Sequence, residues 1–332
     1  MINSPASSPG GRPTGFTLKI LFLIQSHKDP DQLFRLVRIL RKGCPNSSVL
    51  VSHDENAPLL PPTLFSKDPN VHVVTGRGGR GDFLIIDGYL KALNWLQRNH
   101  VDYDWLINLS GSDYPVSSLF RLQVELRDAV HDGFLHHFDA VRPNLTEMAP
   151  MSWPARYGYD RYYYQYRKLK ANLSKLERIL LAAPRLFTDR YVKTVRINTA
   201  FGLMIGIESK VTPFTENFRC YAGSYWHSIR RRCAEYLISF ANERPDVVAY
   251  FRKVLVPDES FIQTVLVNNS SFRFVNENRR YCDMTQSRHG HPKILTDHDV
   301  QAILGKDYFF ARKLERQSGE RVFDSLDEVA CS

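Results

Sequence analysis

The first half of the chain repeats one pattern, in which a short apolar segment is followed by a longer amphipathic one. Residues 18–25 are almost all apolar, as in a strand that is buried on both faces of a sheet. Asp29 then suits a helix cap, Pro30 a first helical position, and Gln32 the third residue of a capping box. Repeated strand–helix units predict a doubly wound, mostly parallel α/β sheet with helices on both faces. The predicted strands are 18–25, 49–52, 71–74, 105–109 and 134–141, and the predicted helices after the first are 83–96 and 119–130.

Several polar segments follow the predicted strands directly. Ligands of such sheets bind beyond the carboxyl ends of the strands, where His53, Asp54 and residues 110–115 are expected. The Gly/Arg-rich loop 76–81 is also expected there, but it lacks the Gly-Lys-Ser/Thr of a phosphate-binding loop and the spacing of a dinucleotide fingerprint. Its arginines either approach a diphosphate or are simply solvated.

The formal net charge of +9 is compatible with three kinds of partner, namely nucleic acid, an anionic membrane surface or a phosphate-bearing substrate. A nucleic-acid-binding protein should gather its basic residues in one stripe, so we expect no nucleic acid partner. The five cysteines are scattered without a Cys-x-x-Cys pair, which indicates neither a disulfide framework nor a zinc site. Together with the absence of a long apolar segment, this predicts a cytoplasmic protein, with peripheral contact with an anionic membrane as an open alternative.

Changes in composition predict the domain organisation. Residues 1–16 are rich in Ser, Pro and Gly and are expected to form a disordered tail, and 317–332 a C-terminal tail. Residues 17–316 are expected to form a single domain with a Tyr/Arg-rich insert at about 151–196. Aromatic rings among cations suit sugars, bases or lipid head groups. The alternative is a packing insert with solvated charges.

A Pro-Asp-Glu segment at 257–259 precedes a short apolar helix pattern. We expect Asp258 to cap this helix and Glu259 to lie in its first turn, where the helix dipole favours an ionised carboxylate. A carboxylate held in this way can act as a general base, although acidic residues are also common at this position as caps alone.

The His/Asp-rich segment near residue 297 raises the question of a metal. Thr296 reads as a helix cap, and Asp297 and Asp299 read as residues of the first turn of that helix. The chain also has no Asp-x-Asp triplet after an apolar strand; Ser112 and Asp113 occupy the corresponding place. We therefore expect no metal site and no cofactor.

Five motifs, taken together and in order, resemble a known family. Residues 108–115 (NLSGSDYP) resemble the LSG-x-D-Y/F-P signature of the core-2/I-branching β-1,6-N-acetylglucosaminyltransferases and peptide xylosyltransferases. Residues 51–54 (VSHD) resemble that family's H-x-D strand end, and 257–264 (PDESFIQT) its PDE-x-x-x-QT segment. Residues 223–236 and 280–313 resemble its GS-x-W segment and its RY…HPK…FARK close, so that the resemblance spans nearly the whole chain.

The resemblance implies a GT-A-like fold and an inverting, metal-independent glycosyltransferase that moves N-acetylglucosamine or xylose from a UDP-sugar to a hydroxyl of a glycan or other acceptor. Glu259 matches the family's base. Tyr225 and Trp226 of the GS-x-W segment are expected to bind the acceptor. Arg161 is expected there too, but from its place among the aromatic rings of the insert, because the insert resembles no acceptor site of the family. The expected nucleotide- and diphosphate-binding residues are His53, Asp54, Asp113, Arg288, Lys293 and Lys313.

One departure from the family pattern keeps the donor open. The family usually approaches the helix at Phe83 through an aromatic-Gly-x-Ser segment, whereas this chain has Arg80, Gly81 and Asp82 there. The alternative functions are a relative that binds a sugar nucleotide without catalysis and, as the less favoured one, a basic nucleic-acid-binding protein.

Overall fold

A computed structural model describes residues 17–332 except for 80, 145–146, 148–152, 155 and 286–291. The predicted N-terminal tail, 1–16, lies outside the described residues. Within the described part, no helix is long and apolar enough to cross a membrane.

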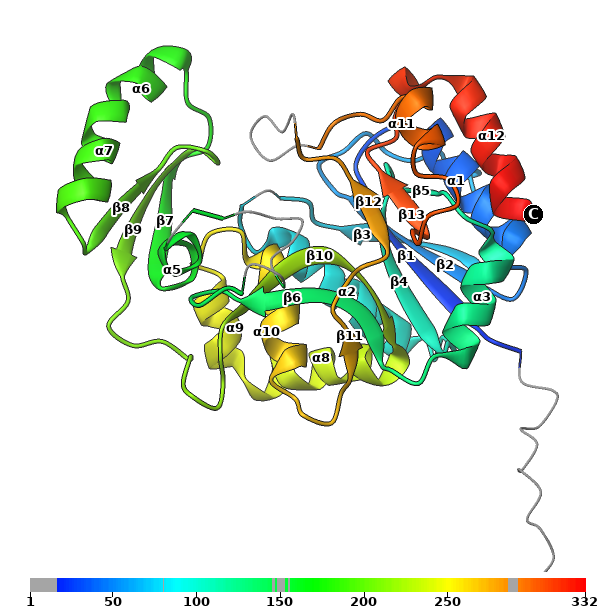
Figure 1. Cartoon of the computed structure of the whole chain (residues 1–332), viewed down its shortest axis with the longest axis horizontal. Coiled ribbons are helices and arrows are strands. Elements are labelled where there is room, and N and C mark those ends of the chain that lie inside the picture. The colour runs from blue at the N-terminus through cyan, green and yellow to red at the C-terminus, as the bar shows by residue number, and fades with distance from the viewer. Residues whose placement is uncertain (1–16, 80, 145–146, 148–152, 155, 286–291) are drawn as a thin grey trace, which may run out of the picture.

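A seven-stranded sheet in the order β11-β6-β10-β4-β1-β2-β3 forms the centre of the molecule (Figure 1). Six of its strands run parallel and only β10 runs opposite to its neighbours, which confirms the predicted mostly parallel α/β sheet and fits a GT-A-like fold. The strands are β1 (Ile20–Ser26), β2 (Ser48–Asp54), β3 (Val71–Gly76), β4 (Trp105–Ser110), β6 (Gly133–Asp139), β10 (Tyr221–Arg230) and β11 (Phe274–Val275).

Both faces of this sheet are buried, because alternate residues of its strands enter two separate apolar cores. In β1, Phe22 and Ile24 pack in one core, and Leu21 and Leu23 pack in the other. The first core holds α1 (Pro30–Gly43), α3 (Leu119–Asp128), α11 (Asp297–Gln301) and α12 (Glu320–Cys331). The second holds α2 (Leu84–Arg98), α8 (Arg231–Glu243), α9 (Pro245–Phe251) and α10 (Phe261–Val267).

A second sheet joins the C-terminal part of the chain to the middle of the main sheet. It has the order β12-β13-β5, with β5 antiparallel to β13, and its β13 carries Phe310 and Ala311 into the first core. Its strands are β5 (Tyr114–Pro115), β12 (Arg280–Cys282) and β13 (Phe310–Arg312).

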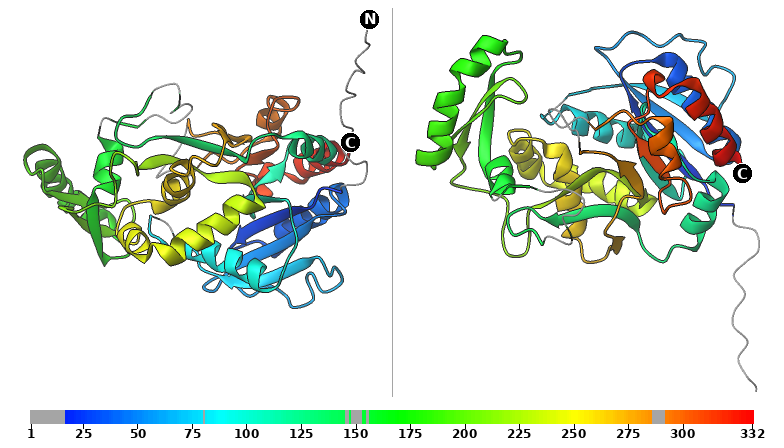
Figure 2. Two further views of the ribbon diagram at one scale, coloured as in Figure 1. Left: turned by 90° about the horizontal axis from the view of Figure 1, so that it is seen from below. Right: turned by 45° about the horizontal axis from the view of Figure 1, so that its top comes forward.

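The third sheet, in the order β7-β9-β8, belongs to a small lobe that we define as residues 157–208. The lobe lies at the opposite end of the molecule from α12 (Figures 1 and 2). It covers most of the predicted insert 151–196 but continues to Glu208 through β9. Its elements are α5 (Tyr157–Tyr162), β7 (Tyr164–Lys170), α6 (Lys175–Leu180), α7 (Ala182–Tyr191), β8 (Val195–Asn198) and β9 (Leu203–Glu208).

Two local predictions differ from the structure. Residues 317–332, expected as a tail, mostly form helix α12 after the short 3₁₀ turn η2 (Arg316–Ser318), because Val322, Phe323 and Leu326 are buried along one helix face. Asp29 does cap α1, accepting a hydrogen bond from the backbone N–H of Gln32 at 3.2 Å. The Gln32 side chain, however, donates to two backbone carbonyls outside the helix instead of completing a capping box.

Candidate active site

The carboxyl ends of β1 and β2 are joined by His53. Its Nδ1 lies 2.8 Å from Ser26 Oγ, and its Nε2 lies 2.9 Å from the carbonyl oxygen of Pro58. His53 is buried and both ring nitrogens have partners, so the structure gives it a role in holding the strand ends together and does not support the predicted nucleotide contact. Asp54 is partly exposed at the same edge, where its Oδ1 accepts from Asn56 in the following turn.

Asp113 is also structural. None of its surface is exposed, and its Oδ2 accepts hydrogen bonds from the backbone N–H and the hydroxyl of Ser110. Its Oδ1 lies 3.9 Å from Nε of the buried Arg280. The predicted nucleotide contact of Asp113 is therefore wrong for this conformation. The motif at 110–115 instead builds the turn between β4 and β5.

A group of cations lies beside the end of β1. Lys313 Nζ and Lys28 Nζ are 2.5 and 2.6 Å from the same oxygen of Glu315, and all three side chains come from segments at the carboxyl edge of the sheet. Burial lowers the pKa of nearby His27, and the charges of Lys28 and Lys313 lower it further. One carboxylate shared by two lysines leaves positive charge that an anionic ligand can use.

Arg312 precedes Lys313 and faces another way. Its guanidinium stacks on the ring of Trp226, with 4.1 Å between Cζ and the ring centroid. Its Nε and Nη1 are enclosed and have no hydrogen-bond partner among the described residues. Enclosed guanidinium nitrogens without an acceptor are costly, so this arrangement suits an anion that arrives with a ligand.

Tyr225 and Trp226 were both expected near the acceptor; their rings lie 5.1 Å apart, centroid to centroid, and both pack against the second core. Tyr225 is buried and its hydroxyl donates to Gln25 Oε1 at the end of β1, so its predicted acceptor contact is wrong for this conformation. Trp226 is partly buried beneath Arg312, and its acceptor role stays a prediction.

Glu259 ends a 3₁₀ turn, η1 (Pro257–Glu259), that stands ahead of α10. Ser260 occupies the N-cap position of α10, so the expected Asp258 cap and the place of Glu259 in the first turn are both corrected. The turn is held between the loop after β3, through Val256 N to Gly81 O, and the start of β10, through Ser260 Oγ to Tyr221 O at 2.7 Å. These contacts place Glu259 at the carboxyl edge of the sheet.

Arg161 of the small lobe holds the Glu259 carboxylate. Its Nη1 donates to Glu259 Oε2, and its Nη2 donates to the Tyr157 hydroxyl at 2.8 Å. The rings of Trp153 and Tyr157 lie 4.6 and 4.1 Å from the guanidinium carbon. Burial alone would lower the pKa of Arg161, but Glu259 raises it above its ordinary value. Arg161 is thus committed to Glu259, which argues against its predicted acceptor contact.

The carboxyl group of Asp258 adjoins this pair. Its Oδ1 is enclosed and has no hydrogen-bond partner in the described part of the chain. Burial and the neighbouring charge of Glu259 raise its pKa to about 7. Of the two carboxyl groups in the turn, that of Glu259 is paired with Arg161 through Oε2, and the Glu259 side chain is 29% exposed.

A pocket of about 380 Å³ opens between the end of β6 and the start of β10. The backbone carbonyl of Tyr221, in the pocket wall, accepts the hydrogen bond from the Ser260 hydroxyl, and Ser260 directly follows Glu259 in the chain. The pocket is therefore close to the turn that carries Glu259. Neither Arg142 nor Arg219 forms an ion pair with any described residue. The pocket is lined by His137, Asp139, Arg142, Glu147, Arg219, Tyr221 and Val267.

The remaining predicted residues lie near the C-terminus. Arg288 falls outside the described residues. Lys293 Nζ is 2.7 Å from Asp299 Oδ1, and Asp299 also accepts from Thr296, which confirms the predicted cap of α11. Among the residues that the structure describes, no three His, Cys, Asp or Glu side chains converge as metal ligands would.

Three site residues escaped the sequence analysis. Lys28 directly follows the first strand, so its place beyond a carboxyl strand end was a readable signal. The sequence does not single out Arg312 beside Lys313, because its position on the Trp226 ring depends on the fold. Nothing in the local sequence marks Glu315 as the partner of two lysines.

The chain is similar in sequence to known proteins. Residues 160–307 match the family model described as the core-2/I-branching enzyme. The chain is 25% identical over 278 residues to the beta-glucuronosyltransferase GlcAT14A of Arabidopsis thaliana, and 24% identical over 274 residues to GlcAT14B of the same plant. Each alignment covers 80% of this chain, and 52% and 53% of the respective relative.

These matches place the similarity of the chain among the glycosyltransferases. More narrowly, residues 160–307 match the core-2/I-branching enzyme model, which confirms the resemblance seen in the motifs. The chain spans about half the length of the two plant relatives. A putative glucose-1-phosphate thymidylyltransferase from Bacillus anthracis superposes with a TM-score of 0.34 and 8% identity over 77% of this chain and 86% of its own, a similarity too low to carry an argument.

Proposed function

We propose that this domain transfers a sugar from a UDP-sugar to a hydroxyl group of a glycan or other acceptor, with inversion at the anomeric carbon. The observation that carries the proposal is the partly exposed Glu259 carboxylate, of which one oxygen, Oε2, accepts a hydrogen bond from Arg161. The other oxygen is left to accept a proton. Cations gather at the same edge of the sheet, as the departure of a diphosphate requires.

Glu259 is the proposed general base. As the acceptor oxygen bonds to the anomeric carbon, its proton passes to the carboxylate, and the bond between that carbon and the UDP oxygen breaks. The leaving UDP takes the electron pair of the broken bond. Attack from the face opposite UDP gives inversion.

Lys313 and Lys28 are the proposed cations for the departing diphosphate, with Arg312 close in sequence on the Trp226 ring. On binding, the ligand would compete with Glu315 for the lysines and supply the acceptor that Arg312 lacks. Fixed cations can perform the charge stabilisation that a metal gives other enzymes of this type. This is the basis for proposing a metal-independent reaction.

The donor sugar is proposed as one of three. The motifs favour N-acetylglucosamine or xylose, and the names of the two plant relatives add glucuronic acid. For the acceptor, we assign the pocket beside Tyr221, because its mixture of arginines, carboxylates and an aromatic ring offers hydroxyl groups both donors and acceptors.

The test is a donor screen on the full chain. UDP release is measured with UDP-N-acetylglucosamine, UDP-xylose and UDP-glucuronate, each with and without EDTA and with a panel of glycans. Transfer from one donor that survives EDTA supports the proposal. Binding of UDP without transfer from any donor would instead identify a sugar-nucleotide-binding relative without catalysis.

A further inference from the structure

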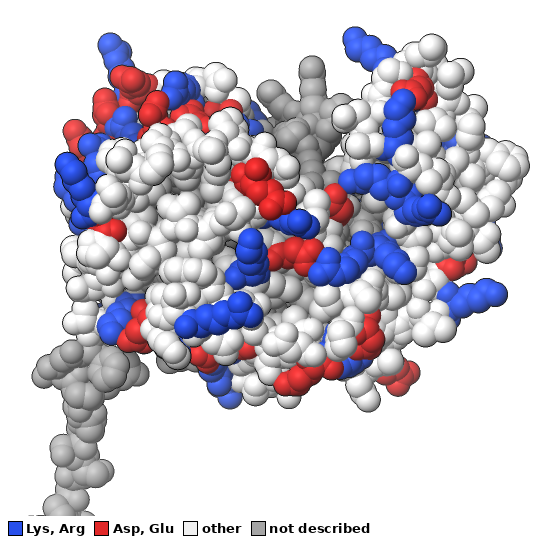
Figure 3. All heavy atoms as spheres, turned by 180° about the vertical axis from the view of Figure 1, so that it is seen from behind, with Lys and Arg blue, Asp and Glu red and all other residues white. Residues whose placement is uncertain are grey.

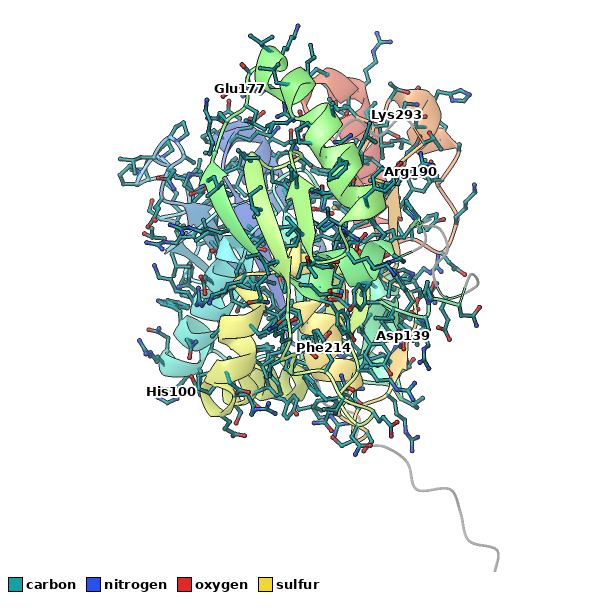
Figure 4. All side chains as sticks on the ribbon, turned by 90° about the vertical axis from the view of Figure 1, so that its left-hand side faces the viewer. His100, Asp139, Glu177, Arg190, Phe214 and Lys293 are labelled. Atoms are coloured by element: carbon teal, nitrogen blue, oxygen red, sulfur yellow. The ribbon has the colours of Figure 1, made fainter. Side chains whose placement is uncertain are left out.

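Helices α6 and α7 of the small lobe have no buried side chain. They project at the end of the lobe that faces the viewer in Figure 4, where Glu177 of α6 and Arg190 of α7 are labelled. Single exposed apolar residues are ordinary, but six large ones on two consecutive helices form a patch. Their exposed fractions are Leu176 65%, Ile179 70%, Leu180 64%, Leu186 63%, Phe187 58% and Tyr191 66%.

The patch exists because polar contacts help attach the two helices to the lobe. Arg178 donates to the carbonyl oxygen of Thr199 at 2.6 Å, and Arg185 donates to the Thr199 hydroxyl at 3.4 Å. From the sheet, Arg196 donates to the Val192 carbonyl at the end of α7 at 2.7 Å. Arginines thus occupy the side that faces the sheet, and large apolar residues of both helices are left to solvent.

Large apolar residues of each helix are spaced one helical turn apart. Leu176, Ile179 and Leu180 follow the i, i+3, i+4 spacing of one face of α6. On α7 the rings of Phe187 and Tyr191 lie one turn apart, with 5.4 Å between their centroids. The pair is therefore an amphipathic hairpin whose outer side lacks a partner among the described residues.

The charge of this region is strongly positive. Between residues 167 and 193 the chain has eight basic and two acidic residues, a net charge of +6 against +9 for all 332 residues. Of the two acids, Glu177 pairs with Lys170 at 2.5 Å. Figure 3 shows this lobe at the right, largely uncharged at its outer side with Lys and Arg side chains standing out from it. Arg167, Lys175, Arg190 and Lys193 are exposed and form no ion pair with a described residue.

We propose that α6 and α7 are a docking surface for an anionic lipid bilayer. Apolar side chains flanked by lysines and arginines are the chemistry of helices that lie in the interface of a membrane, with apolar groups among the acyl chains and cations at the phosphates. A second copy of this chain would also cover the patch, but it would bring a second surface of charge +6 against the first. Charge complementarity therefore favours the bilayer.

The lobe that carries the docking surface contacts the segment that precedes the proposed base. The lobe is fastened to the segment before Glu259 by two backbone hydrogen bonds, from Leu255 N to Arg161 O at 3.1 Å and from Tyr166 N to Lys253 O at 2.5 Å. Docking would therefore hold Glu259 in a fixed orientation relative to the bilayer. The patch itself includes no residue of the proposed active site, so docking and UDP binding can be measured separately.

The test is cosedimentation of the full chain with vesicles of phosphatidylcholine alone and of phosphatidylcholine mixed with phosphatidylglycerol. We expect binding to the mixed vesicles, weakened by salt, and little binding to the neutral ones. The double variant Ile179→Asp/Phe187→Asp should bind the mixed vesicles at least about tenfold more weakly. Phe120→Asp is the matched control, because Phe120 is 69% exposed on α3, and it should bind like the wild type.

Folding of each variant is checked by circular dichroism and by UDP affinity, which the double variant should retain. The triple variant Lys175→Glu/Arg190→Glu/Lys193→Glu keeps the apolar patch and should lose the preference for phosphatidylglycerol. Absence of vesicle binding by the wild type, or equal binding by the double variant, would overturn the proposal. Concentration-dependent dimers that Ile179→Asp/Phe187→Asp abolishes, without vesicle binding, would show that a second copy covers the patch.

Discussion

Arg161 and Glu259 form an ion pair although 98 residues separate them in the chain. The arginine belongs to α5 at the base of the small lobe, and the glutamate belongs to the turn η1 beside the main sheet. The aromatic rings around Arg161 restrict it, so the pair fixes the direction of the carboxylate. The lobe therefore takes part in positioning the proposed base.

Glu259→Gln keeps the shape of the side chain and removes its basicity. We expect turnover to fall by at least about 100-fold, the usual loss when a general base is removed, with UDP affinity nearly unchanged. Steady-state kinetics with the donor found in the screen, together with calorimetry for UDP, measure both quantities.

Glu235→Gln provides a matched control, because Glu235 lies on α8 and pairs with Arg231 at the surface. It should keep wild-type turnover. If Glu259→Gln also kept wild-type turnover, Glu259 would be a structural residue of the turn and another group would have to accept the proton.

Lys313→Ala tests the cation proposed for the diphosphate. Loss of one charge-assisted contact should cost about 1.5–3 kcal/mol of UDP binding, and turnover should fall as well. Lys306→Ala removes an exposed lysine of a nearby loop and should leave both unchanged. Calorimetric titration with UDP separates the two variants.

Metal independence has its own measurement. We expect the wild-type rate to survive excess EDTA, because Lys28 and Lys313 meet the charge of the leaving group. Complete inactivation by EDTA, reversed by Mn²⁺ or Mg²⁺, would return Asp54 to consideration as a ligand. The buried Asp113 could join it only after a rearrangement of the turn around Ser110.

The main sheet was predictable from the sequence because its strands are buried on both faces. Nearly continuous apolar segments such as 18–25 have few alternatives to a strand in a covered parallel sheet. The predicted C-terminal tail was wrong although its signal was present, since Val322, Phe323 and Leu326 follow helical spacing. The antiparallel direction of β10 was not predictable, because direction depends on tertiary connections and not on local pattern.

The site was predictable only where a motif marks the residue itself. The Pro-Asp-Glu segment drew attention to Glu259, but its partner Arg161 is set by the packing of the lobe. Burial was the other limit. The sequence around Asp113 and Tyr225 does not reveal that both side chains are buried and form hydrogen bonds with other protein groups.

Arg312→Met should have opposite effects on ligand binding and on the stability of the unliganded protein. Methionine keeps an apolar contact with Trp226 and removes a charge whose Nε and Nη1 have no partner among the described residues. We expect the unliganded variant to be more stable by about 1 kcal/mol, because two enclosed nitrogens without acceptors are lost, and to bind UDP or the donor at least about tenfold more weakly. Thermal unfolding with and without UDP checks both effects. A variant that is less stable and binds normally would show that Arg312 is a structural residue.

Asp258→Asn gives a prediction of pH dependence. Burial and Glu259 raise the pKa of Asp258 from 3.8 to about 7, so between these values the folded chain keeps a proton that the unfolded chain has released. The stability of the wild type therefore falls as the pH rises through this window and levels off above 7. Asparagine carries no charge at any of these pH values. We expect the variant to gain about 2–4 kcal/mol relative to the wild type between pH 4 and pH 8.

Urea unfolding of both proteins at pH 4, 6 and 8 measures this gain. Asp246→Asn is the control, because its hydrogen bond with Arg244 lowers the pKa of Asp246 below 3.8. Its titration therefore ends below this pH range, and its difference from the wild type should be the same at all three pH values. A constant difference for Asp258→Asn would mean that Asp258 stays ionised throughout. Arg161 would then have to balance two carboxylates in the turn, and the choice of Glu259 as the base would have to be tested against Asp258.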